Sequence, residues 1–259
     1  MENWIICLAT PFLGTALGAS CVIFMKDTMK GRMQNTLIGF AAGVMVAASI
    51  WSLLIPSIEM SGYDGFMKVV PAVTGFLIGI FFLLSLDTLI PHQHISEPNS
   101  EGPKSRLSRT TKLVLAITLH NIPEGMAVGV VLAGALQGSP GTTMAGAIAL
   151  AIGMAIQNFP EGAIVSMPLR SEGNSRKKSL LLGVLSGCVE PVATIVTLLV
   201  TDAIFPLLPY VLAFSAGAMM YVVVEELIPQ TQEGEHSNLG TVGFALGFVL
   251  MMILDTVMG

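Results

Sequence analysis

Residues 112–136 read KLVLAITLHNIPEGMAVGVVLAGAL, an apolar run of 25 residues that is interrupted near its middle by one carboxylate, Glu124. A helix of about 20 apolar residues crosses the hydrocarbon core of a bilayer, which is roughly 30 Å thick. The stretch therefore predicts a membrane-spanning helix that holds His120 and Glu124 within the bilayer.

Seven more runs of similar length and composition lie along the chain, between polar breaks. Of the 259 residues, 53% are hydrophobic and 11% are charged, against about 25% charged in an ordinary soluble domain. We therefore expect an all-α integral membrane protein with a single polytopic domain over residues 1–259. The net charge of −5 argues against a nucleic-acid partner. The eight predicted spans are 4–25, 35–58, 69–91, 112–136, 142–169, 180–201, 207–229 and 239–258.

The basic residues mark one set of loops between these spans. Eleven of the 12 Lys and Arg residues fall on loops of one side, and Lys68 alone falls on the other. By the positive-inside rule the basic loops are cytoplasmic, so both termini are expected on the extracellular or periplasmic side of a plasma or inner membrane. The longest of these loops, residues 92–111, is rich in Pro, Ser and Gly, which favours a flexible cytoplasmic segment.

Spans two and seven share a sequence pattern. Residues 39–45 read GFAAGVM and residues 213–219 read AFSAGAM, and each stretch is followed later in its span by Leu-Ile-Pro. The two spans are separated by an odd number of crossings, so they run in opposite directions. This predicts an inverted repeat that relates helices 1–3 to helices 6–8. The alternative is that Gly- and Ala-rich helices resemble one another by composition.

Charged residues inside the predicted spans are all acidic. An isolated carboxylate in a bilayer is strongly disfavoured unless it binds a proton or a cation, so these residues predict a cation pathway. The helical rise of about 1.5 Å per residue places Glu124, Glu161 and Glu190 near the midplane, together with Met45. The candidate pathway residues lie near the cytoplasmic ends (Asp87, Glu225, Glu226) and the outer end (Asp255) of their spans.

Two related motifs lie at the midplane, HNIPEG at 120–125 and QNFPEG at 157–162. Residues four apart share a helix face, so each motif presents its first residue and its glutamate to one cavity. The asparagine is the next residue along the helix and lies on the adjacent face. Imidazole and carboxylate ligands suit Zn(II), Fe(II) and similar ions, and two carboxylates able to bridge indicate two neighbouring metals. The candidate metal ligands are Met45, His120, Asn121, Glu124, Gln157, Asn158, Glu161 and Glu190.

Three of these interpretations have structural alternatives. Asp87, Glu225 and Glu226 either belong to the pathway or are solvated residues at the membrane interface. The thioether of Met45 is either a soft ligand or ordinary core packing in a chain with 16 methionines. His92 and His94, on the cytoplasmic loop, either capture metal that leaves the pathway or belong to a solvated segment that binds none.

The motif pair resembles that of the ZIP (Zrt-, Irt-like) family of divalent metal transporters, especially its prokaryotic GufA-type members, and the resemblance spans all eight predicted helices. It implies a 3+2+3 helix arrangement, import toward the cytoplasm and homodimers. It also implies a binuclear midplane site. One metal lies near Met45, His120, Glu124, Gln157, Glu161 and Glu190, and the second near Asn121, Glu124, Asn158, Glu161 and Glu190. Some members have aspartate where Asn158 stands, so the second site is expected to be weaker or differently charged.

We therefore expect transport of divalent transition-metal ions by alternating access, with Zn(II) as the first candidate and Cd(II), Fe(II), Mn(II) and Co(II) as alternatives. No enzyme activity, catalytic residue or prosthetic group is expected. A metal-selective ion channel and a membrane metal sensor are alternatives, although no signalling domain is recognisable. An intramembrane metalloprotease is a third, but the chain lacks the His-Glu-x-x-His spacing that places two histidines beside a general base.

Overall fold

The structure of the chain is a computed structural model that describes residues 3–24, 31–90, 103, 109–171, 173–232 and 237–258. Within these residues all regular secondary structure is helical, and eight helical segments are long and apolar enough to cross a membrane. The predicted all-α membrane fold with eight spans is therefore confirmed.

Each observed span begins and ends within a few residues of its predicted bounds. The predicted loop at 92–111, with His92 and His94, lies outside the described residues except for Pro103 and the start of the helix at Arg109. In chain order the elements are α1 (Asn3–Phe24), α2 (Gly31–Ala48), η1 (Ser49–Leu54), α3 (Ile55–Glu59), η2 (Gly65–Val69), α4 (Val70–Leu89), α5 (Arg109–Leu136), α6 (Met144–Ser171), α7 (Arg176–Gly187), α8 (Val189–Ile204), η3 (Phe205–Leu207), α9 (Leu208–Val222), η4 (Val223–Leu227), α10 (Ile228–Thr231) and α11 (Leu239–Met258).

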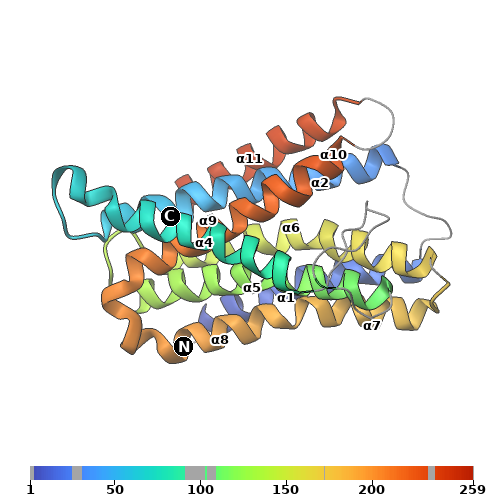
Figure 1. The fold of residues 1–259 in the computed structure, drawn as a ribbon, viewed down its shortest axis with the longest axis horizontal. Coiled ribbons are helices and arrows are strands. Elements are labelled where there is room, and N and C mark those ends of the chain that lie inside the picture. The colour runs from blue at the N-terminus through green and yellow to red at the C-terminus, as the bar shows by residue number, and fades with distance from the viewer. Residues whose placement is uncertain are drawn as a thin grey trace.

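The helices form two groups that lie against each other (Figure 1). One group contains α2, α4, α9 and α11, and the other contains α1, α5, α6, α7 and α8. The most extensive packing pairs α2 with α11, α4 with α9, α1 with α6, and α5 with α8. The predicted inverted repeat would superpose the α2–α11 pair on the α9–α4 pair. It would also superpose the α1–α6 pair on the α8–α5 pair. The packing therefore favours the predicted repeat over chance similarity of composition, while the 3+2+3 grouping stays a prediction.

Glycines allow the paired helices to approach closely. A Cβ atom at Gly43 of α2 would collide with the carbonyl oxygen of Phe244 in α11, and one at Gly217 of α9 with that of Phe76 in α4. In lipid, such close backbone packing contributes strongly to helix association, because apolar side chains gain little by leaving lipid for protein. Gly43 and Gly217 occupy the same place in the two sequence motifs, so both copies use the same packing device.

Both motifs also lead into a π-helix. The π-helix η1 ends directly before Ile55-Pro56, and the π-helix η4 ends directly before Ile228-Pro229. Pro56 follows its motif glycine, Gly43, by 13 residues, whereas Pro229 follows Gly217 by 12. The π-helix η1 has six residues and η4 has five, which accounts for the difference of one residue. Short π segments inside helices occur frequently at functional sites.

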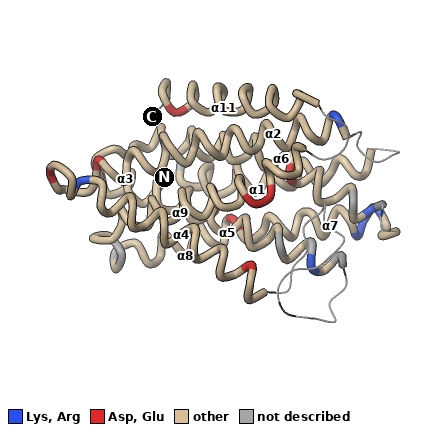
Figure 2. Tube along the Cα trace, turned by 45° about the horizontal axis from the view of Figure 1, so that its top comes forward, with Lys and Arg blue, Asp and Glu red and all other residues tan. Residues whose placement is uncertain are grey.

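The described Lys and Arg residues other than Lys68 lie toward one end of the bundle, the end at which α7 starts (Figure 2). We call this the basic end. The two ends of the chain lie toward the opposite end, which we call the terminal end, and Lys68 is found there in η2. Which end faces the cytoplasm stays a prediction.

Candidate metal centre

The two motifs bring their polar side chains together in the middle of α5 and α6. Unpaired polar groups are costly in such a place, so each must find a hydrogen-bond partner, a charge or a ligand. Glu161 is only partly buried and lines a pocket, but the other predicted ligands are buried. The buried set is Met45, His120, Asn121, Glu124, Gln157, Asn158 and Glu190.

Glu190 at the start of α8 is held by donors from three other helices. Its Oε1 accepts hydrogen bonds from Thr15 Oγ1 of α1 at 2.8 Å and from Asn121 Nδ2 of α5 at 3.3 Å. Its Oε2 accepts one from Asn158 Nδ2 of α6 at 2.7 Å. The carboxylate therefore joins four helices. Thr15 was not predicted from the sequence.

Three buried oxygen atoms at the centre have no hydrogen-bond partner among the described residues: Asn121 Oδ1, Glu124 Oε2 and Gln157 Oε1. Leaving such acceptors unpaired is costly, and a bound cation would satisfy them. Glu161 adds a further carboxylate, which repels Glu124, Glu190 and Glu226 electrostatically. A divalent cation among these groups would relieve that repulsion as well.

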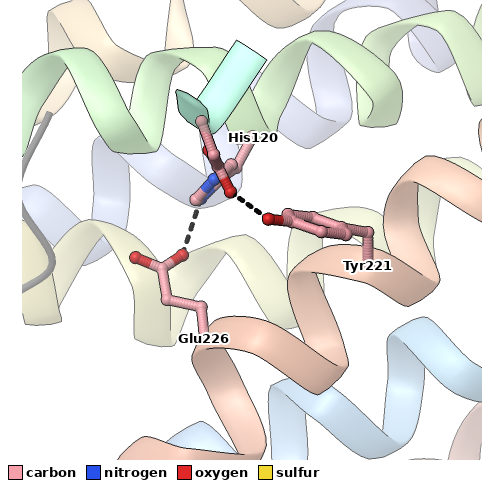
Figure 3. A network of polar contacts seen from close by, with 4 residues as sticks. His120, Tyr221 and Glu226 are labelled. Atoms are coloured by element: carbon pink, nitrogen blue, oxygen red, sulfur yellow. Dashed lines mark hydrogen bonds and ion pairs between the residues drawn. The ribbon is translucent and has the colours of Figure 1, made fainter. Parts of the chain in front are cut away.

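His120 pairs with Glu226, whose Oε2 lies 2.6 Å from His120 Nδ1 (Figure 3). The sequence placed Glu226 near the cytoplasmic end of its span, but the π-helix η4 brings it to the imidazole. Next to this pair, the hydroxyl of Tyr221 donates a hydrogen bond to Asp87 Oδ2. Tyr221 was not predicted either, and its only signal is a hydroxyl within an apolar span five residues before Glu226.

A narrow pocket of about 40 Å³ reaches the centre. Its polar lining includes His120, Asn121, Glu161 and Glu226, and Gln230 extends it toward the basic end, where α10 finishes. The centre can therefore be approached from the basic end.

A second pocket, of about 250 Å³, lies at the terminal end, and its lining includes Trp51, Ser52, Glu59 and Asp255. Ser52 Oγ of η1 donates a hydrogen bond to Asp255 Oδ1 at 2.6 Å. The other oxygen, Asp255 Oδ2, is buried and has no hydrogen-bond partner among the described residues. Asp255 thus lies at a pocket near the end of its span, as predicted, while Ser52 and Glu59 are additional residues of this pocket.

Some predicted residues are not brought to the centre. Glu225 is exposed although its neighbour Glu226 is buried, and its place on the pathway stays a prediction. Met45 is fully buried within the apolar core, and its role as a ligand stays a prediction. Within the described part of the chain, no three His, Cys, Asp or Glu side chains are gathered closely enough to hold a metal by themselves. A metal here would need the amide oxygens as well.

Comparison with known proteins decides the family. A family model described as ZIP zinc transporter matches residues 92–255. This chain belongs to the ZIP family. Zinc transporter ZIPB of Bordetella bronchiseptica is 36% identical to this ZIP protein over 255 residues, which cover 97% of this chain and 80% of the relative.

Two further relatives match almost end to end. Zinc transporter GufA of Myxococcus xanthus is 34% identical, covering 97% of this chain and 98% of the relative. Zinc transporter ZIP11 of Xenopus tropicalis is 35% identical, covering 95% of this chain and 94% of the relative. The predicted GufA-type assignment is therefore confirmed. These relatives are named as transporters, in agreement with the expectation that this ZIP protein is not an enzyme.

Proposed function

We propose that this chain transports divalent metal ions across the membrane, with Zn(II) as the main substrate, through the centre between α5, α6 and α8. The observation that carries the proposal is a set of buried oxygens beside Glu161, at the middle of an eight-span bundle, that have no hydrogen-bond partner in the described part of the chain: those of Asn121, Glu124 and Gln157. His120 supplies the nitrogen ligand that zinc favours. The relatives named as zinc transporters support zinc over Cd(II), Fe(II), Mn(II) and Co(II).

A carrier fits the two pockets better than a channel does. Asp255 lies one turn from Met251 toward the terminal end of α11, and Gln157 lies one turn from Gly153 toward the basic end of α6. Met251 is fully buried, and its thioether packs directly against Gly153. In this proposal the buried contact of Met251 with Gly153 is the apolar barrier between the terminal-end pocket and the centre, whereas the basic-end pocket is lined by residues of the centre.

Alternating access would open the centre to the other end when one helix group moves against the other. Metal then enters near Asp255, binds at the centre and leaves past Glu226 and Asp87. The basic end faces the cytoplasm in this proposal, and transport is uptake across a plasma or inner membrane, with a homodimer as the assembly that the family resemblance implies. Met45 adds a thioether ligand on this path.

The test is metal uptake into liposomes that contain the purified protein, with Zn(II) as the substrate and Cd(II), Fe(II) and Mn(II) as competitors. Glu161→Ala is expected to abolish uptake, because a carboxylate at the centre is lost. Glu225→Ala is the matched control, since this exposed glutamate lies outside the centre and uptake should persist. If no metal moves in the wild type, the centre is a sensor or structural site and the transport proposal is wrong.

A further inference from the structure

The hydrogen bonds around Glu190 bear on how many metal ions the centre holds. A second metal would need oxygen ligands from Asn121, Asn158 and Glu190, in addition to bridging glutamates. In the structure both oxygens of Glu190 accept hydrogen bonds, and those from the two asparagines come from amide nitrogens. An amide nitrogen donates protons and offers no lone pair to a cation. The nitrogens of Asn121 and Asn158 therefore point where a second metal would find its ligand.

The oxygen of Asn158 is engaged as well. Gln157 Nε2 donates a hydrogen bond to Asn158 Oδ1 at 2.5 Å, which fixes the amide with its nitrogen toward Glu190. Thr15 Oγ1 adds a donor from α1 on the opposite side of the carboxylate. A metal on Glu190 Oε2 would compete with the hydrogen bond from Asn158, and a metal on Oε1 would compete with those from Thr15 and Asn121. The two amide nitrogens also lie within hydrogen-bond distance of the carbonyls of Ser186 and Pro11, so the Thr15 hydroxyl is the buried donor that would lose its partner, which is costly. By contrast, Glu124 Oε2, Gln157 Oε1 and Asn121 Oδ1 need no such displacement.

At position 158 this chain has a neutral side chain that donates a hydrogen bond, where some members of the family have a negatively charged aspartate. An aspartate in its place would put a second carboxylate within hydrogen-bond distance of Glu190 Oε2, since Asn158 Nδ2 lies 2.7 Å away. Two carboxylates so close repel each other, and one takes a proton or both share a cation. The amide instead satisfies Glu190 directly. The Asn158 side chain thus avoids the second negative charge that would otherwise call for a proton or a cation at this point.

We infer that the Glu190 carboxylate is a fixed anchor held by Thr15, Asn121 and Asn158, and that the centre binds one metal ion per chain, ligated on the side of His120, Glu124, Gln157 and Glu161. This inference rests on the proposed function, because it counts the metal ions at the transport site. Thr15 and Asn158 are positioning residues in this account. They hold the Glu190 carboxylate in place beside the metal site.

The test is the zinc content of the purified full-length protein. The protein is loaded with Zn(II) in detergent and freed of unbound metal, and bound zinc is measured against protein concentration. Wild type is expected to hold about one zinc and Asn158→Asp about two, because the new carboxylate creates the second site. X-ray absorption of bound zinc gives a second readout, since two metals about 3.5–4 Å apart produce metal–metal scattering. That scattering is expected in Asn158→Asp alone.

Asn174→Asp is the matched control, since it makes the same chemical change outside the centre, where Asn174 Nδ2 donates to the carbonyl of Leu169. It should hold one zinc like wild type. Two zinc ions in the wild type would overturn the inference, and so would an Asn158→Asp protein that holds one. A wild type that binds no zinc would contradict the proposed function itself, whereas the two results above would contradict only the inferred number of metal ions.

Discussion

The terminal and basic ends of the bundle use the same backbone device with different side chains. At the terminal end the π-helix η1 places Ser52 Oγ 2.6 Å from Asp255 Oδ1, and at the basic end the π-helix η4 places Glu226 Oε2 2.6 Å from His120 Nδ1. A π-helix holds more residues per turn than an α-helix, so it turns the following side chains to a different face. Each end thus gains one polar contact to another helix.

What differs is the position of the carboxylate. At the terminal end the carboxylate lies on α11, is held by a neutral hydroxyl and lines a pocket, and its other oxygen has no hydrogen-bond partner among the residues that the structure describes. At the basic end it lies on the π-helix itself and is bound to a predicted metal ligand, beside a pocket that reaches the centre. The terminal end is therefore suited to attract a cation, and the basic end to orient a ligand.

Replacement of Glu226 by Gln should have the largest effect of the tests below. The carboxylate orients the His120 imidazole, and loss of such an outer partner typically reduces metal affinity or activity by about 10–100-fold. We expect the initial rate of Zn(II) uptake into proteoliposomes to fall by about that factor. Glu225→Gln, one residue away and exposed, should keep nearly the wild-type rate. Equal losses in both variants would refute the pairing as the cause.

Replacement of Asp255 by Asn should have a smaller effect, and on a different parameter. A carboxylate in a pocket raises the local concentration of cations, but it lies outside the centre. We expect the KM for Zn(II) uptake to rise by about tenfold while the maximal rate changes little. A fall in the maximal rate with unchanged KM would instead place Asp255 in a later step.

The spans and most of the centre could be predicted from the sequence because their signals are local. An apolar run of fixed length and two matched Asn-x-Pro-Glu-Gly motifs need no tertiary information. Glu225 and Glu226 could not be separated in this way, since they are adjacent and lie at the same depth. Only the turn of η4 decides that Glu226 faces His120 while Glu225 is exposed.

Thr15 was missed for a related reason. A threonine in an apolar helix usually donates its hydroxyl proton to a carbonyl one turn back, as Thr197 and Thr201 do. Nothing near Thr15 in the sequence marks it as different. Its partner, Glu190, is 175 residues away, so the contact follows from the packing of α1 against α8 and not from any motif.

Replacement of Thr15 by Val should have the smallest effect on transport and a measurable one on stability. Side-chain hydrogen bonds in membrane proteins contribute about 0.6 kcal/mol on average and up to about 1.7 kcal/mol. A bond to a carboxylate belongs at the upper end of that range, because charged partners strengthen hydrogen bonds. We expect Thr15→Val to lose about 1–2 kcal/mol and its Tm in detergent to fall by roughly 2–8 °C.

Thr194→Val is the matched control for this measurement. Thr194 is equally buried and close to the same glutamate, but its hydroxyl donates to the main-chain carbonyls of Gly125 and Glu190, at 2.8 and 3.0 Å. Its loss should cost about 0.5 kcal/mol, because the acceptors are neutral. A larger fall in Tm for Thr15→Val than for Thr194→Val would show that the hydroxyl of Thr15 holds a charged carboxylate. Equal falls would mean that Glu190 is not held as a carboxylate anion, and the anchor described above would lose its electrostatic basis.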